Sequence, residues 1–272
     1  MPLRPAIVIF TDEPGWHGQQ LETWFTENGL RTKCVSLREC HIEFTGEAGG
    51  IWIPGFDGHL PDGAFVRGVP GGSLEEIVLR LDYLHHIAAL GRPVFNSGRV
   101  IERTVDKGMT SLLLRNSGIP TPKTFVSESV DEVKNYVDSE LRSGRTLVKK
   151  PLFGSQGRGL RWIKTASDLS YLLQGEVVYL QEVIENGDGP FCDCRFMVID
   201  GEAIAAMERS SHDWITNRAL GAECRSIRLQ ENLARLAEGA AAAVGAEYAC
   251  LLYTSDAADE GLGVDLGGRR II

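Results

Sequence analysis

The sequence predicts an α/β (α+β) fold built from successive segments, and three observations support this. An apolar run at residues 6–10, a helical stretch and a β-type run at 32–37 form a β-α-β opening. Residues 123–184 follow the order β-α-β-β-α-β, which is typical of a small α+β lid over a larger sheet. From residue 193 onward the pattern becomes an antiparallel meander. We therefore expect three parts, at residues 1–100, 101–190 and 191–272.

Composition and charge narrow the functional classes. The chain has 272 residues, 43% hydrophobic and 24% charged, as in a globular protein. Its formal net charge of −9 gives no support to nucleic-acid binding. No apolar run approaches the ~18 residues of a membrane-spanning helix, and the run after Met1–Pro5 is too short for a signal peptide. Six cysteines without a C-x-x-C pair indicate free thiols in a reducing cytoplasm.

The first hundred residues contain the clearest helix of the chain, expected at 74–90. Apolar residues recur there on one face, and Ser73 and Glu76 form an S-x-x-E capping box. The glycine-rich loop at 67–72 leads into this helix, whose N-terminus could bind an anion. A loop that only turns the chain is an equal alternative. Short strands that continue the first α/β layer are expected at 51–53 and 64–66.

The later elements follow from caps, stops and alternation. Ser129 and Glu132 cap a helix, Asp200-Gly201 is a hairpin turn signal, and Gly245 ends the last helix. The elements expected, in order, are strand 94–95, helix 106–116, strand 123–126, helix 129–141, strands 146–150 and 160–163, a helix from about 167, strand 177–184, hairpin strands 195–199 and 202–207, strand 225–229 and helix 231–244.

The stretch at 149–159 is typical of strand, glycine-rich turn and strand. Three glycines in six residues allow a tight backbone that brings N–H groups close to a ligand. A lysine at the strand end supplies a charge for phosphate. A flap that covers phosphate and a plain β-hairpin with a glycine turn both fit this spacing. It is not a Walker A loop, because no Gly-Lys-Ser/Thr ends it.

The order of polar residues along the chain adds information that no single motif carries. Two lysines flank the first part of the lid, a strand edge suited to adenine follows, and acids and arginines come later. Together these residues predict a nucleotide cleft between two sheets, with a late acid for Mg²⁺. They are Lys107, Lys150, Gln181–Ile184, Asp193, Arg195, Arg209, Asn217 and Asp265.

Short motifs occur in a consistent order at 66–73, 96–97, 106–110, 150–159, 181–184 and 214–217. With these motifs the chain resembles the ATP-grasp superfamily, and most closely the RimK-type ATP-dependent α-L-glutamate ligases, from about Phe65 to Leu229. Trp214-Ile215-Thr216-Asn217 and Pro70-Gly71-Gly72-Ser73 are most similar to members resembling tetrahydromethanopterin:α-L-glutamate ligase. The resemblance implies an ATP-grasp fold with an N-terminal Rossmann-like domain at 1–100, a lid at 101–190 and an incomplete C-terminal sheet at 191–272.

The resemblance also implies residues for the nucleotide. Lys107 and Lys150 would contact the ATP phosphates, with Lys150 rather than Lys149 because it directly precedes Pro151. Asp193 would meet the ribose. The flap would cover the phosphates through backbone groups of Ser155, Gln156 and Gly157, and the strand end would hold adenine through Gln181, Glu182, Val183 and Ile184. Without the resemblance, Lys107 could be a solvated helix lysine and Asp193 an ordinary strand-edge acid.

Catalytic and metal roles follow in the same way. Arg209 and Asn217 would lie beside the transferred phosphoryl group or acyl phosphate, and Asp265 would be a Mg²⁺ ligand. Arg209 lies on an otherwise apolar strand, and a buried arginine needs a partner. Arg67 and Arg218 are, with Arg209, candidates to pair with an acidic substrate.

The implied reaction is a carboxylate–amine ligation. ATP phosphorylates a substrate carboxylate, and the α-amine of L-glutamate attacks the acyl phosphate. The cofactors implied are ATP and Mg²⁺, with Mn²⁺ as a substitute. The partners implied are a small-molecule carboxylate, such as a pterin cofactor, and L-glutamate, with homo-oligomers as an option and neither nucleic acid nor membrane. The alternatives are a deazaflavin, a protein C-terminus or an amino acid as acceptor, or nucleotide binding without catalysis.

Two departures from the family pattern concern the C-terminal part. The chain stops at Arg269–Ile272, before the Glu-x-Asn motif that supplies further Mg²⁺ ligands in the family. Residues 250–262, either a native insertion or an artefact, separate Ala249 from Gly263-Val264-Asp265. A single carboxylate holds Mg²⁺ poorly. We therefore expect weak or no ligase activity from this exact polypeptide.

Overall fold

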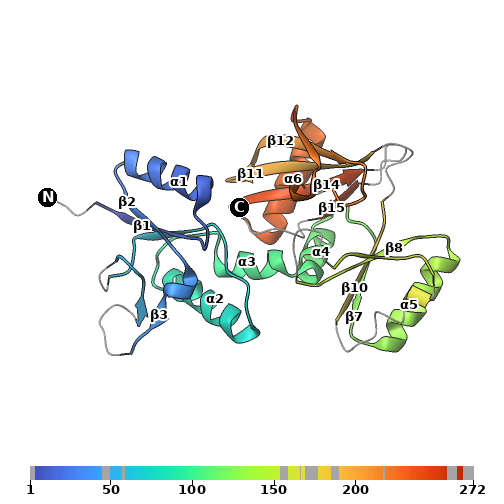
Figure 1. Ribbon diagram of the computed structural model, residues 1–272, viewed down its shortest axis with the longest axis horizontal. Coiled ribbons are helices and arrows are strands. Elements are labelled where there is room, and N and C mark those ends of the chain that lie inside the picture. The colour runs from blue at the N-terminus through green and yellow to red at the C-terminus, as the bar shows by residue number, and fades with distance from the viewer. Residues whose placement is uncertain are drawn as a thin grey trace. The chain divides into compact units, whose positions relative to one another are not determined.

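The computed structural model divides into two compact units, one up to Ile101 and the other from Glu102 to Arg269 (Figure 1). The ranges that it describes are 4–44, 50–56, 59–153, 159–165, 167–168, 177–184, 190–216, 218–255 and 262–265. Within them, no helix has the length and apolar character needed to cross a membrane. All six cysteines are free thiols, as the sequence predicts.

The first unit is built on a parallel sheet in the order β2-β1-β5-β6. Its helices α1 and α2 lie on opposite sides of this sheet (Figure 1). Val8 and Phe10 of β1 pack in one apolar cluster with Leu84 and Ile87 of α2. The bounds are β1 Ala6–Phe10, α1 Gly15–Glu27, β2 Arg31–Val35, η1 Leu37–Glu39, β3 His41–Ile42, β4 Ile51–Trp52, β5 Gly63–Val66, α2 Leu74–Ala89 and β6 Val94–Phe95.

The capping box predicted for α2 is confirmed, since the Ser73 and Glu76 side chains each accept from the other's backbone N–H. One strand prediction is wrong in its placement. The strand expected at 51–53 is β4, which does not continue the parallel sheet but pairs antiparallel with β3 in a separate ribbon. Stacking of the His41 and Trp52 rings, 4.8 Å apart, accompanies this local pairing.

The second unit begins with helices and the lid sheet. Asp106 separates α3, Gly98–Val105, from α4, Lys107–Asn116. Its side chain caps α4 by accepting from the backbone N–H groups of Gly108 and Met109. The antiparallel lid sheet has the order β7-β10-β8-β9, and α5 packs on one face of it. Its bounds are β7 Thr124–Ser127, α5 Val130–Arg142, β8 Leu147–Lys150, β9 Arg161–Ile163 and β10 Val178–Glu182. The helix expected from about 167 falls mostly outside the described residues.

The C-terminal sheet is antiparallel in the order β13-β12-β11-β14-β15. Asp200 and Gly201 turn the β11–β12 hairpin with positive φ angles of 51° and 78°, which confirms the predicted turn. Helix α6 packs against β11, β12 and β14 and ends at Gly245. The bounds are β11 Phe191–Ile199, β12 Glu202–Ser211, η3 Arg218–Leu220, β13 Glu223–Ile227, α6 Glu231–Val244, β14 Tyr248–Ser255 and β15 Leu262–Asp265.

The stretch that departs from the family pattern begins inside a strand. Tyr248–Ser255 forms one strand, β14, in continuous register with β11 from Ile199↔Tyr248 to Cys194↔Tyr253. Strand β15 then pairs antiparallel with its second half. The first residues of the stretch 250–262 are therefore part of the sheet rather than of a loop.

Candidate functional site

Lys150 lies on the face of the lid sheet opposite α5. Successive residues of a strand point to opposite faces, and directly paired residues share a face. Lys150 pairs with Tyr179, whereas Lys149 pairs with Leu180. Leu180 belongs to the apolar cluster under α5. The register therefore separates the two adjacent lysines and supports the choice of Lys150 as the lysine for phosphate.

The Lys150 ammonium is held by a side-chain amide two residues along the facing strand. Its Nζ donates to Gln181 Oε1 at 2.5 Å. The amide nitrogen of Gln181 donates to Thr124 Oγ1 and to the Tyr179 hydroxyl, each at 3.0 Å. Gln181 is only 3% exposed. This buried amide thus links the lysine to a hydroxyl group of the amide's own strand, β10, and to one of the neighbouring strand β7.

The network continues into the first turn of α4. The hydroxyls of Tyr179 and Ser111 are 3.0 Å apart, and Ser111 Oγ donates to the backbone carbonyl of Lys107 at 2.8 Å. Lys107 is 5% exposed, and its Nζ donates to the carbonyl of Leu152 at 3.3 Å. The alternative of a solvated helix lysine is therefore wrong for Lys107. The two lysines predicted to contact phosphate belong to one hydrogen-bonded group.

The strand end predicted for adenine is the carboxyl end of β10. The backbone N–H of Glu182 donates to Lys123 O at 2.8 Å, and that of Val183 donates to Thr146 O at 3.0 Å. Glu182 pairs with Leu147, so it occupies the α5 side of the sheet, whereas Gln181 occupies the side of Lys150. Ile184 follows outside the strand. Of the strand residues predicted to contact adenine, Gln181 is therefore the one on the face of Lys150.

Asp193 and Arg209 form a buried ion pair on the C-terminal sheet. They are directly paired across β11 and β12. Arg209 Nε donates to Asp193 Oδ1 at 2.7 Å and Arg209 Nη2 donates to Oδ2, so the guanidinium binds the carboxylate at two points. Thr216 also donates to Oδ2. The side chains are 1% and 8% exposed, so Asp193 is no ordinary strand-edge acid and is the partner that Arg209 requires.

Arg195 is a further basic residue of this face. It was predicted to lie in the nucleotide cleft, with no role assigned to it. It lies two residues after Asp193 on β11 and therefore on the same face. Its Nε is buried and has no hydrogen-bond partner among the described residues. Leu252 of β14 pairs with Arg195, and Asp265 of β15 pairs with Leu252. The register thus aligns Asp265 with the row of Arg195, across the intervening strand.

Other predicted site residues lie outside the described residues, namely Ser155, Gln156 and Gly157 of the flap and Asn217. For Asp265 the structure describes the strand only. Among the side chains that are described, no group of three or more His, Cys, Asp or Glu residues could hold a metal ion. The Asp193 carboxylate is already bound by Arg209 and Thr216. The described donors therefore do not form a Mg²⁺ site.

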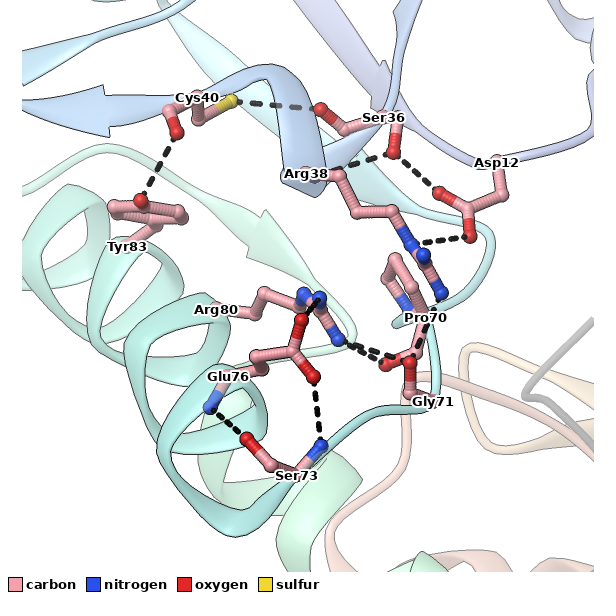
Figure 2. Close-up of polar contacts among 10 residues, drawn as sticks. All are labelled: Asp12, Ser36, Arg38, Cys40, Pro70, Gly71, Ser73, Glu76, Arg80 and Tyr83. Carbon is pink, nitrogen blue, oxygen red and sulfur yellow. Dashed lines mark hydrogen bonds and ion pairs between the residues drawn. The ribbon is translucent and has the colours of Figure 1, made fainter.

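In the first unit, two arginine side chains bind carbonyl groups of the glycine-rich loop at 67–72, which precedes helix α2. The buried Arg80 donates to Pro70 O at 2.9 Å and to Gly71 O at 3.1 Å, and Arg38 donates to Gly71 O at 3.0 Å (Figure 2). The Glu76 carboxylate accepts from the backbone N–H of Ser73, which holds the pKa of Glu76 below its usual value. Of the two alternatives, the chain-turning loop fits these contacts better.

Comparison with known proteins adds an independent line of information. Residues 104–257 match the family described as the RimK-like ATP-grasp domain. The tetrahydromethanopterin:alpha-L-glutamate ligase of Methanococcus maripaludis is 33% identical over 254 residues, covering 89% of this chain and 82% of that protein. The enzyme of the same name from Methanosarcina acetivorans is 29% identical over 269 residues, covering 89% and 79%.

Relatives named for other acceptors match a shorter part of the chain. The alpha-aminoadipate–LysW ligase LysX of Saccharolobus solfataricus is 31% identical and covers 56% of each chain. The coenzyme gamma-F420-2:alpha-L-glutamate ligase of Methanococcus maripaludis is 25% identical, covering 57% of this chain and 55% of that protein. Among solved structures, the ATP-grasp ligase PsnB with a minimal precursor superimposes with a TM-score of 0.70 at 22% identity, covering 96% of this chain and 89% of that one.

Proposed function

Because the chain belongs to the RimK-like ATP-grasp family, we propose that it is an ATP-dependent carboxylate–amine ligase that adds L-glutamate to a small carboxylate acceptor. The observation that carries this proposal is the hydrogen-bonded group that unites Lys107 and Lys150. Two buried or half-buried ammonium groups on one sheet face and the adjoining helix turn form a site for a polyanion such as the ATP triphosphate.

The proposed chemistry needs positioning and charge rather than a nucleophile from the protein. The lysines neutralise phosphate charge, while the acceptor carboxylate attacks the γ-phosphorus and ADP leaves. The α-amine of glutamate then attacks the acyl carbon and inorganic phosphate leaves. Arg195 is the arginine proposed to attract carboxylate or phosphoryl oxygens, and Arg209 on the same face, fixed by Asp193, is proposed to orient the transferred group. Asn217 keeps its proposed role beside the transferred group.

We propose ATP with Mg²⁺, or Mn²⁺ in its place, as the nucleotide complex. A divalent ion would shield the triphosphate charge when bound. Since the described side chains do not form a metal site, no step is assigned to that ion, and Asp265 remains a proposed ligand only. The backbone of Ser155, Gln156 and Gly157 is proposed to cover the phosphates, and Gln181–Ile184 and Asp193 are proposed to contact the adenosine.

For the acceptor we favour a reduced pterin cofactor that carries a carboxylate. The support is that two relatives named tetrahydromethanopterin:alpha-L-glutamate ligase each match 89% of this chain, whereas the two relatives named for other acceptors match 56% and 57% of it. L-Glutamate is the proposed amine donor. A deazaflavin cofactor and a small carrier protein with a terminal carboxylate remain the second acceptor classes to test.

The test is an acceptor screen with ADP and phosphate release as the readout. The full chain is incubated with ATP, Mg²⁺ and L-glutamate, and with each acceptor in turn. We expect ADP release that requires both glutamate and the pterin acceptor, with a product heavier by one glutamate residue. Release with a different acceptor would correct the substrate. Nucleotide binding without ADP release for any acceptor would favour a nucleotide-binding protein without catalysis.

Lys149 offers a matched control for this assay, because it is the neighbour of Lys150 on the opposite face of the same strand. We expect Lys150→Met to lower ADP release by about 100-fold, as loss of a charged donor to a reacting phosphoryl group typically does. Lys149→Met should leave most of the activity. Equal losses in both variants would contradict the assignment of Lys150.

A further inference from the structure

The buried hydrogen-bonded group of the lid has a single consistent direction of donation. Ser111 Oγ has one hydrogen, which it donates to Lys107 O. Tyr179 must therefore donate its own hydrogen to Ser111 Oγ across their 3.0 Å contact. The Tyr179 oxygen is then left to accept, and it does so from Gln181 Nε2. Each hydroxyl in this chain of contacts thus both accepts and donates.

This direction fixes which way the Gln181 amide faces. With its nitrogen bound to the hydroxyls of Thr124 and Tyr179, its oxygen must face Lys150, and that oxygen accepts from the Lys150 ammonium. Thr124 in turn donates to Pro122 O at 2.8 Å, so its oxygen is also an acceptor toward Gln181. An amide turned the other way would set an NH₂ group against an ammonium group.

The same contacts join two elements that are far apart in the sequence. Ser111 lies one helical turn after Lys107 in α4, and Tyr179 lies on β10, 68 residues after Ser111. Tyr179 is fully buried and directly opposite Lys150 in the sheet register. Its hydroxyl therefore ties the helix turn that carries Lys107 to the strand pair that carries Lys150.

We propose that Tyr179 and Ser111 are positioning residues, which hold the Gln181 amide and thereby the Lys150 ammonium group, and which fix the helix turn that carries Lys107, ready for a nucleotide polyphosphate. The part of this inference that concerns a nucleotide rests on the proposed function. The part that concerns how Lys150 is held does not. Neither residue needs to touch the nucleotide. Their effect passes through Gln181 to Lys150, and through the first turn of α4 to Lys107.

The first measurement requires no nucleotide. Lysines of the folded full chain are acylated with a limiting amount of an N-hydroxysuccinimide ester, and labelling of Lys150 and Lys149 is quantified by mass spectrometry of peptides. Tyr179→Phe and Ser111→Ala should raise Lys150 labelling by about fivefold, the effect of losing one hydrogen bond, and leave Lys149 labelling unchanged. Unchanged Lys150 labelling in both variants would overturn the proposal.

The second measurement is the dissociation constant for Mg²⁺–ADP by titration calorimetry. Each single variant should weaken binding by about 5-fold to 30-fold. The double variant should lose little more than one single variant, because both substitutions remove the same contact. Ser111→Thr, which retains a hydroxyl able to bond the Lys107 carbonyl, should restore both labelling and affinity.

Tyr83→Phe is the matched control for a merely structural effect. Tyr83 is also buried, at 2% exposed, and its hydroxyl donates to Cys40 O at 3.0 Å in the first unit. Its loss should lower stability without changing Lys150 labelling or Mg²⁺–ADP affinity. Equal effects of Tyr83→Phe and Tyr179→Phe on those two readouts would contradict a positioning role. Failure of the wild-type protein to bind Mg²⁺–ADP would instead contradict the proposed function. The labelling result would still decide whether Tyr179 and Ser111 hold Lys150.

Discussion

The lid group around Gln181 and the Asp193–Arg209 pair hold charged side chains in different ways. In the lid, one ammonium group is bound by a neutral amide whose remaining donors end on hydroxyls. On the C-terminal sheet, a guanidinium binds a carboxylate at two points and nearly all of both side chains is buried. In the first arrangement the amide that binds the ammonium group is neutral, whereas in the second the guanidinium binds a group of opposite charge.

That difference indicates different tasks. A neutral amide orients an ammonium group without offsetting its charge, which suits the binding of an anion such as phosphate. An arginine bound to a buried carboxylate has a fixed orientation, but the carboxylate offsets its charge. Such an arginine is better suited to orienting a ligand and stiffening the sheet than to attracting an anion strongly. The two regions should therefore respond differently when one partner is removed.

The largest effect is expected at the ion pair. Arg209→Met leaves the Asp193 carboxylate buried with Thr216 as its remaining described partner. An unpaired buried charge typically costs about 3–5 kcal/mol, so the free energy of unfolding should fall by that amount. Urea titration followed by circular dichroism measures it. The double variant Asp193→Leu/Arg209→Met should recover much of the loss, and a double variant as unstable as Arg209→Met would contradict the ion-pair explanation.

A smaller effect is expected when the neutral amide is removed from the lid. Gln181→Leu keeps the approximate volume but leaves the Lys150 ammonium and two hydroxyls without their shared partner. We expect a loss of about 1–3 kcal/mol in the free energy of unfolding. Gln181→Glu should restore the contact to Lys150 but not the donation to the hydroxyls, so urea titration should place it between wild type and Gln181→Leu.

A smaller effect again is expected at Glu140, whose carboxylate is buried while its partners Arg145 and Lys123 are partly exposed. The hydrogen bond from Arg145, with that from Lys123, holds the pKa of Glu140 below its usual 4.5. This contribution to stability is present above the unfolded pKa and is lost as pH falls through the lower folded pKa.

We therefore expect Glu140→Gln to be less stable than wild type at about pH 7, by up to about 1 kcal/mol, and the difference to shrink toward about pH 3. Paired urea titrations at both pH values measure this. A difference that stays constant with pH would show that charge at Glu140 does not contribute.

The smallest effect is expected at an arginine–carboxylate ion pair on the surface. Arg235 donates to Glu231 one turn away on α6, and both side chains are largely exposed, at 74% and 80%. Arg235→Ala should change the free energy of unfolding by no more than about 0.5 kcal/mol, and 0.5 M salt should remove most of that change. A loss comparable to that of Arg209→Met would show that burial is not what separates the two pairs.

Much of the candidate site follows from local sequence patterns. The strand that carries Lys150, the helix that begins at Lys107 and the hairpin turn between β11 and β12 were all expected from caps, turns and alternation, whereas the extension of that hairpin to Asp193 and Arg209 was not. The separation of Lys149 from Lys150 follows once the strand exists, because alternation sends neighbours to opposite faces. Tyr179 and Ser111 could not be found this way, since a buried tyrosine and a helical serine are ordinary residues in sequence.

The amino-acid sequence by itself determined the α/β fold class, the cap of α2, the hairpin at Asp200-Gly201 and the order of motifs that places the chain in its family. These depend on contacts between residues close together in the chain, or on residue types alone. The tertiary structure decided that β4 leaves the parallel sheet, that Arg209 finds its partner in Asp193, and that Tyr179 meets Ser111 across 68 residues. Strand pairing and side-chain burial set those contacts, and both are decided only when distant segments pack together.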